Sequence, residues 1–205
     1  MVTSNRDPAR TRERILRSAR REFVAKGFAG ARVNTIARSA GVNKRMLYHY
    51  FGDKEALFRT ILREHITASV ETIAAAPPDT AELLPFLFTR AAEDTESIRL
   101  LQWEALDAGA RQVIAEDERR KAWREGSERI RDAQRLGLIH SDLDPELLAL
   151  SLKALAVFPL AFPQLARLAT GARPGDAEFR RRQAQFFRRL GTYLRPRSNP
   201  KEKCR

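Results

Sequence analysis

The spacing of apolar residues along the chain restricts its fold more than any other feature. Ile15, Ala19 and Phe23 recur every four residues, which places them on one face of a helix, and a helical period returns in most later segments. No segment alternates strictly between apolar and polar residues, as a half-buried strand does. The sequence therefore predicts an all-α protein with about nine helices.

Glycine, proline and capping residues mark the ends of these helices. Asp7 and Pro8 are typical of a helix start, and Gly27 is typical of a helix end. Two short helices are expected at about 33–40 and 43–51, followed by a longer one at 54–75. Later helices are expected at about 79–95, 97–107, 110–136, 145–169 and 176–194.

A proline-containing linker at 76–79 separates two parts of different charge. Residues 1–70 hold 15 lysines and arginines but 6 acidic residues, so they carry +9 of the net charge of +12. A basic block followed by a near-neutral body predicts a module for nucleic acid joined to a domain with another task. The expected parts are a basic arm at 1–9, a DNA-binding domain at 10–70, a helical ligand-binding and dimerisation domain at 77–195, and a polar tail at 196–205.

The usual sequence patterns of enzymes and metal sites are missing. His49, His65 and His140 lie far apart without metal-ligand spacing, and no glycine-rich phosphate loop occurs. Cys204 is the only cysteine, so one chain can form no internal disulfide. We therefore expect no catalytic activity, no cofactor and no metal.

One apolar stretch, 147–169, is about as long as a bilayer span. Lys153, Gln164, Arg167 and two prolines interrupt it, which favours a buried helix over a membrane span. The first 22 residues are charged almost throughout and contain no signal-peptide core. These patterns predict a cytoplasmic protein.

The segment 33–52 has the layout of a helix-turn-helix, with two short helices joined by a turn at Gly41. Glycine supplies the positive φ that such a sharp turn needs. A small shared core is expected from Ile36, Ala37, Ala40, Val42, Leu47 and Phe51.

The outer face of the second short helix carries cations and hydrogen-bonding aromatic residues. The residues on this face are Lys44, Arg45, Tyr48 and His49. Lysine and arginine can read guanine edges in the major groove, and tyrosine and histidine can bond phosphates. The alternatives are an ordinary core stripe beneath solvated charges, or a basic membrane-surface helix. The glycine turn, the Asn43 cap and the spread of charge over several short helices favour DNA.

Six elements also occur in a familiar order and spacing: TRERIL, Phe23, Gly27, IARSAGV, LYHYF and DKEALF. Over residues 10–70 they resemble the DNA-binding domain of the TetR family of transcriptional regulators. The resemblance implies that the second short helix is the recognition helix, with Lys44, Arg45 and Met46 nearest the bases. It also implies phosphate contacts from Tyr48, Tyr50 and Lys54, and from a basic arm around Arg6, Arg10 and Arg12.

Three positions depart from the common family pattern. Arg32 stands where a capping threonine or serine is usual, and Arg45 and Met46 replace a frequent Gly-Thr pair. A long arginine adds a contact but alters the docking distance, so the operator sequence cannot be transferred from relatives. The complete set expected to bind DNA is Arg32, Asn34, Asn43, Lys44, Arg45, Met46, Tyr48, His49, Tyr50 and Lys54.

A single helix-turn-helix makes few contacts, so a homodimer that reads two half-sites is expected. The resemblance implies that the last two long helices pair with those of a second copy as a four-helix bundle. The expected interface residues are Leu150, Leu155, Phe179, Phe186, Phe187 and Leu190. The same apolar faces could instead fill the core of one subunit, and a helix that is apolar on several sides can do both.

The resemblance further implies an inducer held in the body, whose binding spreads or locks the two DNA-reading heads. The bulky apolar residues there predict an apolar or aromatic effector. The expected lining residues are Phe86, Leu100, Trp103, Phe158 and Phe162. Pro159 and Pro163 are expected to bend the long helix at mid-length and so open space between helices.

The sequence thus predicts a double-stranded-DNA-binding transcriptional regulator, a repressor released from its operator by a small, largely apolar effector. The alternative is a DNA-binding protein of the same fold that is controlled by a protein partner, or that has an architectural role and no ligand. That alternative predicts a filled body without a cavity.

Overall fold

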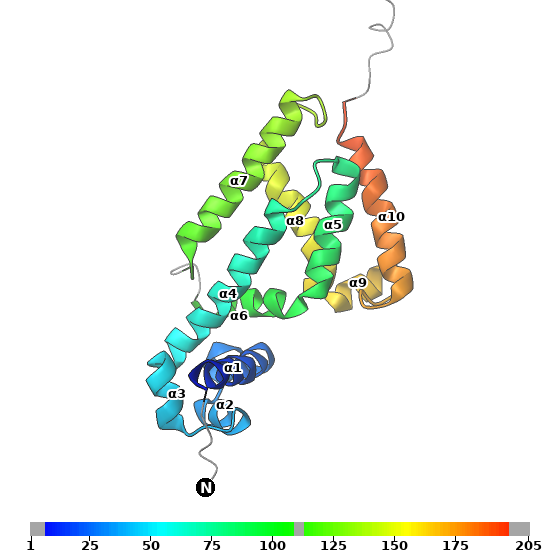
Figure 1. The fold of residues 1–205 in the computed structure, drawn as a ribbon. Helices are drawn as coiled ribbons and strands as arrows, with labels where there is room; N and C mark the ends of the chain where they lie inside the picture. The colour runs from blue at the N-terminus through cyan, green and yellow to red at the C-terminus, as the bar shows by residue number, and fades with distance from the viewer. Residues whose placement is uncertain (1–6, 109–112, 197–205) are drawn as a thin grey trace, which may run out of the picture. The chain divides into compact units, whose positions relative to one another are not determined.

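The computed structural model describes residues 7–108 and 113–196, and these residues form helices and connecting turns. The predicted all-α class is confirmed, with ten helices in the described ranges where about nine were expected (Figure 1). The first five are α1 (Pro8–Gly30), α2 (Val33–Ser39), α3 (Lys44–Phe51), α4 (Lys54–Ala74) and α5 (Thr80–Glu93). The others are α6 (Thr95–Ala108), α7 (Glu116–Arg135), α8 (Pro145–Ala161), α9 (Pro163–Thr170) and α10 (Ala177–Tyr193).

The chain divides into two compact units. The N-terminal unit comprises the described residues of Met1–Ala68 and Glu96–Glu116. The C-terminal unit comprises those of Ser69–Thr95 and Asp117–Arg205. Helix α6 therefore belongs almost entirely to the N-terminal unit, although it follows the 76–79 linker in the sequence.

The core of the N-terminal unit is built on α1 and α4. Ile15, Ala19 and Phe23, the residues whose spacing predicted α1, are fully buried. The ring of Phe23 lies edge-on to that of Phe58 in α4, with 5.0 Å between their centroids. Ile61, one turn further along α4, is also fully buried. Burial of these side chains is the main source of stability for the unit.

Side-chain caps confirm three of the predicted helix starts. The side chain of Asp7 accepts a hydrogen bond from the backbone N–H of Ala9 at 2.9 Å, directly before Pro8. The side chain of Asn43 accepts from Met46 N–H at 2.7 Å, and that of Asp53 from Ala56 N–H at 2.7 Å. Each cap satisfies a backbone donor that the first turn of a helix leaves without a partner.

Helix α1 breaks at Gly27, where the sequence predicts its end, but the last turn continues to Gly30. The backbone of Gly27 has φ of 68°, outside helical geometry. The indole ring of Trp103 in α6 packs against this position, so that a Cβ on Gly27 would lie 2.7 Å from ring carbons. The Trp103 indole N–H also donates to the carbonyl of Val24 at 3.2 Å.

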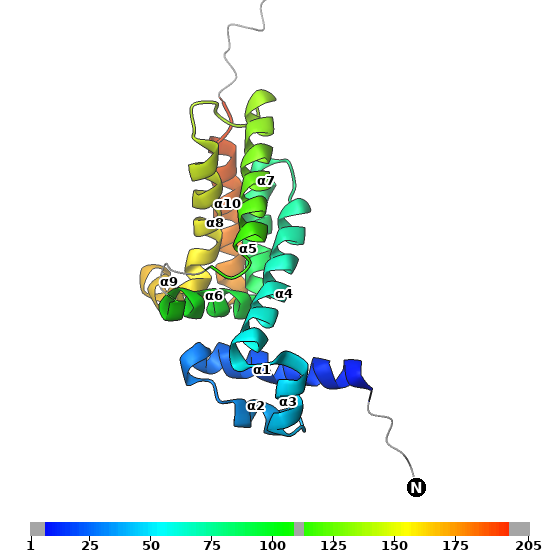
Figure 2. The ribbon, with the colours of Figure 1, turned by 90° about the vertical axis from the view of Figure 1, so that its left-hand side faces the viewer.

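In the C-terminal unit, α5 packs against both α10 and α8 (Figure 1 and Figure 2). Phe88 of α5 and Phe187 of α10 lie at the centre of its core, with ring centroids 5.9 Å apart. The backbones of α5 and α10 approach closely at Gly191, where a Cβ would lie 2.2 Å from the carbonyl oxygen of Thr80. Leu152 and Ala156 complete the contact from α8.

The predicted helix at 145–169 is bent, as expected from its prolines. It consists of α8 and α9, whose axes differ by 88°. The break is at Phe162, directly before Pro163, which begins α9. Proline suits a first helical turn because it has no backbone N–H, and N–H groups in that turn have no acceptor within the helix. It also disfavours helical geometry in the preceding residue. Pro159, by contrast, lies inside α8 without ending it.

No single helix in the described ranges is both long and apolar enough to span a membrane. The bent pair α8 and α9 meets the criteria of length and composition only when its two helices are taken together.

Candidate DNA-binding surface

Side chains of α1 form hydrogen bonds to the turn between α2 and α3 and to the end of α2. Gly41 has φ of 66°, as the sequence predicts for this position. The guanidinium of Arg14 donates to the carbonyl of Ala40 from Nε at 3.0 Å and from Nη2 at 2.6 Å, and to that of Gly41 at 3.1 Å. The Ser18 hydroxyl donates to the carbonyl of Ile36 at 2.9 Å. These bonds satisfy carbonyls at the end of α2 and fix the angle at which α3 leaves the turn.

The predicted small core of the helix-turn-helix is present. Ile36 and Leu47 are fully buried, and Ala37, Ala40 and Phe51 are nearly so. With Leu47 and Phe51 turned inward, the opposite face of α3 is left to solvent. Lys44, Arg45 and His49 are exposed, and Tyr48 is half-buried.

The structure brings four of the predicted DNA-binding residues to one surface depression. Arg32 and Asn34 from the start of α2 line it together with Lys44 and Tyr48 of α3. The Lys44 ammonium lies 5.4 Å from the centroid of the Tyr48 ring. Val33, Thr35 and Arg38 complete the lining, and the sequence had not identified any of the three as a DNA-binding residue. Arg38 follows Asn34 by four residues, so the helical period of α2 could have identified it.

The remaining predicted residues of α3 lie around this depression. Arg45 is exposed, and Met46 is half-buried one residue later. His49 is exposed and its ring lies 5.8 Å from that of Tyr50, which is half-buried. Asn43 is exposed too, but its side chain is occupied by the cap on Met46.

Lys54 is engaged within the protein. Its ammonium lies 4.7 Å from the centroid of the Phe28 ring and 3.4 Å from the carbonyl oxygen of Ala29. A phosphate contact from Lys54 would compete with these interactions or share the ammonium with them, since it has three donors.

Arg32 stands at the start of α2, at the position where a capping threonine or serine is usual. Its side chain makes no capping hydrogen bond. Its backbone N–H instead donates to Oε1 of Glu22 in α1 at 3.1 Å. The guanidinium is thereby left at the surface, at the edge of the depression.

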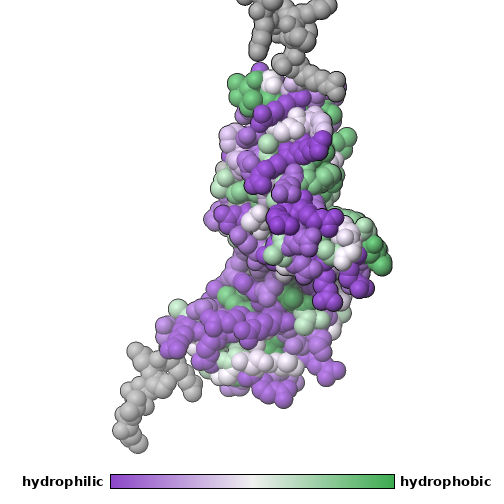
Figure 3. Space-filling model, turned by 90° about the vertical axis from the view of Figure 1, so that its right-hand side faces the viewer, coloured by the Kyte–Doolittle hydropathy of each residue, from purple (hydrophilic) through white to green (hydrophobic). Residues whose placement is uncertain are grey.

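The charge of this surface has one sign. Helices α2 and α3 contain Arg38, Lys44 and Arg45 and no acidic residue. Hydrophilic side chains also predominate over the N-terminal unit on the face shown in Figure 3. A row of cations and hydrogen-bond donors on an eight-residue helix is suited to the phosphates and base edges of a DNA groove.

Two family models match the chain. One is described as bacterial regulatory proteins of the tetR family and matches residues 15–61. The other is described as a tetracyclin repressor-like C-terminal domain and matches residues 79–189, more than half of the chain. The chain belongs to the TetR family of transcriptional regulators.

Individual relatives agree with this assignment. The HTH-type transcriptional repressor SCO4008 of Streptomyces coelicolor is 34% identical over 84% of this chain and 88% of its own length. The repressor NicS of Pseudomonas putida is 39% identical over 49% of this chain and 50% of its own. Among solved structures, the transcriptional regulator SCO4942 of Streptomyces coelicolor superposes with a TM-score of 0.76 at 28% identity, over 92% of this chain and 99% of that one.

This TetR-family chain is therefore a sequence-specific DNA-binding regulator. Its relatives are transcriptional regulators and not enzymes.

The effector-binding residues expected from the sequence are divided between the two units of this TetR-family regulator. Leu100 is buried and Trp103 is bonded to Val24, both within the N-terminal unit. Phe158 and Phe162 are exposed, with ring centroids 5.2 Å apart at the end of α8. Phe86 lies beneath the guanidinium of Arg90 at 5.5 Å. The sequence showed that these residues are bulky and apolar, but not which helices meet.

A cavity of about 400 Å³ instead lies elsewhere within the C-terminal unit. It is a partly open pocket lined by α5, α7, α8, the 76–78 segment and the 136–139 segment, and none of the five expected residues lines it. Its apolar walls include Leu83, Leu87, Trp123, Ile130, Ile139 and Leu152. The sequence signal was weak, because α7 is mostly charged and its apolar stripe is narrow.

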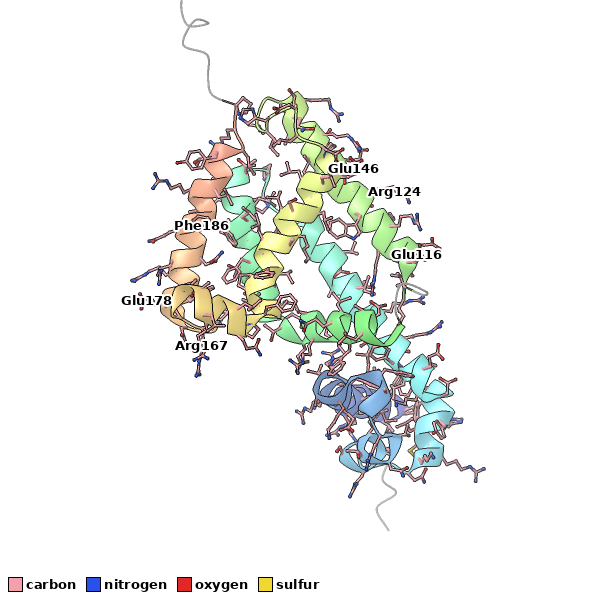
Figure 4. The ribbon with its side chains drawn as sticks, turned by 180° about the vertical axis from the view of Figure 1, so that it is seen from behind. Glu116, Arg124, Glu146, Arg167, Glu178 and Phe186 are labelled. Atoms are coloured by element: carbon pink, nitrogen blue, oxygen red, sulfur yellow. The ribbon has the colours of Figure 1, made fainter. Side chains whose placement is uncertain are left out.

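The expected dimer residues fall into two groups. Leu150, Leu155 and Phe186 are exposed, at 55%, 42% and 58%, and Phe186 lies on the outer face of α10 (Figure 4). Leu190 is half-buried. Phe179 and Phe187 are corrected to core residues, because they are 4% and 1% exposed and pack within the subunit around Phe88.

Proposed function

We propose that this TetR-family regulator is a repressor that binds its operator as a homodimer and is released when a small, largely apolar effector fills the C-terminal cavity. The observation that carries the proposal is the cavity itself. Its volume of about 400 Å³ and its mainly apolar walls fall in the range of small-molecule sites. A regulator controlled by a protein partner alone needs no such space, so the cavity favours an effector over that alternative.

The exposed apolar residues of α8 and α10 support the homodimer. Leu150 and Phe186 are more than half exposed, and leaving side chains of this size in water is unfavourable. Two heads held by one dimer can read two half-sites, which multiplies the few contacts of a single helix-turn-helix. The proposed place of action is the cytoplasm, where bacterial DNA lies.

Operator binding is tested with the purified full chain and the intergenic DNA upstream of its own gene, across a salt series. We expect site-specific binding that weakens steeply with salt, because phosphate contacts release counterions. Arg45→Ala is expected to cost about 1–3 kcal/mol and to relax the sequence preference. Arg90→Ala, which removes the same charge from an exposed position of α5, is the control and should leave operator affinity nearly unchanged.

The two parts of the proposal fail separately. Equal binding to any duplex would contradict sequence-specific repression and leave an architectural protein. Specific binding that no apolar compound weakens, even when the compound is shown to occupy the cavity, would contradict control by an effector. A library of apolar compounds screened for release of the operator complex distinguishes these results.

A further inference from the structure

The cavity in the C-terminal unit is apolar except for a few groups in its wall. Three of its lining residues are ionisable, namely Arg129 and Asp132 of α7 and Lys153 of α8. Two of them are already engaged. Asp132 is ion-paired with Arg135, and Arg129 has a further interaction within the chain.

Lys153 differs from the other two. It follows the buried core residue Leu152 on α8, and its side chain is half-buried. In the described part of the chain it makes no hydrogen bond or ion pair. Burial alone lowers the pKa of its amine below the ordinary value of 10.5, with no neighbouring charge to compensate. Partial burial of an ammonium without a partner is unfavourable, and an anion bound in the cavity would relieve that cost.

We propose that the effector of this regulator is an amphipathic organic acid, whose apolar body fills the cavity and whose single carboxylate binds the ammonium of Lys153. The inference rests on the proposed function and specifies the class of molecule that the same site accepts. Leu83, Leu87 and Trp123 offer apolar surface to the body of the ligand. Lys153 places a cation in the same wall, so an acid satisfies both features and a hydrocarbon does not.

The strength of the pairing follows from its surroundings. A charge-assisted hydrogen bond is about twice as strong as a neutral one, and apolar walls beside it lower the local dielectric. Such bonds contribute roughly 10- to 100-fold in affinity. The carboxylate also gives a partner to an ammonium that makes no ion pair within the described part of the chain. The effect of removing the charge should therefore fall on acids and spare neutral ligands.

The test uses the full-length protein and two probes of equal chain length, decanoate and decanol. Occupancy of the cavity is followed by the fluorescence of Trp123, which lines it, and Trp123→Phe identifies the part of the signal due to that residue. Lys153→Met removes the charge at nearly the same length, and Lys153→Arg keeps it. We expect Lys153→Met to weaken decanoate about 10- to 100-fold and to change decanol by less than about 3-fold. Lys153→Arg should retain most of the affinity for decanoate.

Other outcomes overturn the inference in distinguishable ways. If Lys153→Met binds decanoate as tightly as the wild type, or loses both probes equally, Lys153 does not act as a carboxylate anchor. If neither probe binds the wild type, the cavity does not accept an amphipathic acid. Release of operator DNA by decanol but not by decanoate would contradict the inference that the effector is an acid. It would still agree with the proposed function, in which the effector is a small apolar molecule. Binding of both probes without release would contradict effector control itself.

Discussion

At the scale of single residues, Arg14 shows how a side chain outside α3 determines where α3 points. Its guanidinium bonds carbonyl oxygens of Ala40 and Gly41, which follow it by 26 and 27 residues. The helical period correctly predicts that Ile15 beside it is buried, because burial depends on a repeating pattern. The same pattern says nothing about Arg14, whose role depends on a turn that arrives later in the chain.

Replacing Arg14 by alanine is expected to destabilise the protein by about 1–3 kcal/mol, because the part-buried carbonyl of Ala40 at the end of α2 loses its charged donor. Arg17→Ala is the matched control. Arg17 lies one turn further along α1, and its ion pair with Glu13 at 2.5 Å is exposed to solvent. Exposed pairs of this kind contribute about 0.3–0.5 kcal/mol. Urea unfolding followed by circular dichroism compares the two, and equal losses would show that the Arg14 bonds add nothing.

At the scale of elements, the sequence predicts helix starts better than helix ends and contacts. Asn43 and Asp53 correctly predict the starts of α3 and α4, because a cap is a local interaction between residues close in sequence. The bend before Pro163 is likewise local and was predicted. The lining of the cavity was not predicted, since α5, α7 and α8 are separated in sequence and only their packing brings its residues together.

The contact between α5 and α10 gives a test at this scale. Gly191→Ala would place a Cβ 2.2 Å from the carbonyl oxygen of Thr80 and 2.7 Å from the Cα of Ala81. Backbone atoms cannot rotate away, so we expect a loss of about 3 kcal/mol or more in the free energy of unfolding. Gly126→Ala is the control, because a Cβ there meets nothing within 4 Å inside α7. It should stabilise the protein by about 0.5–1 kcal/mol, and thermal unfolding that shows the same sign for both would contradict the predicted steric conflict.

At the scale of the whole molecule, the family resemblance predicts a dimer and the pattern of burial refines which residues can form it. Periodicity alone does not distinguish an inward face from a face that awaits a second copy. It therefore grouped Phe179 and Phe187, which are buried in the subunit, with Phe186, which is 58% exposed. Only the packed structure separates the two kinds.

The dimer is tested by Phe186→Glu, alone and with Leu150→Glu. A charge in a buried apolar interface is costly, so the double variant is expected to elute with the mass of a single chain and to lose most operator affinity. Leu106→Glu is the control, because Leu106 of α6 is 74% exposed and lies outside α8 and α10. Light scattering coupled to gel filtration measures the mass. A double variant that remains dimeric would contradict an interface formed by α8 and α10 around these two residues.

The fit of Trp103 against Gly27 bears on how regulators of this kind can be recombined. The N-terminal unit is assembled from two separate stretches of chain, and its second stretch follows the 76–79 linker. A chimera joined at that linker would pair one parent's Gly27 with the other parent's α6. Such a chimera keeps this contact only if the same parent supplies Trp103 together with Val24 and Gly27, although Trp103 lies far from both in the sequence. The unit to exchange between regulators is therefore residues 1–68 together with 96–116. A crossover between these two stretches would disrupt the packing of the N-terminal unit.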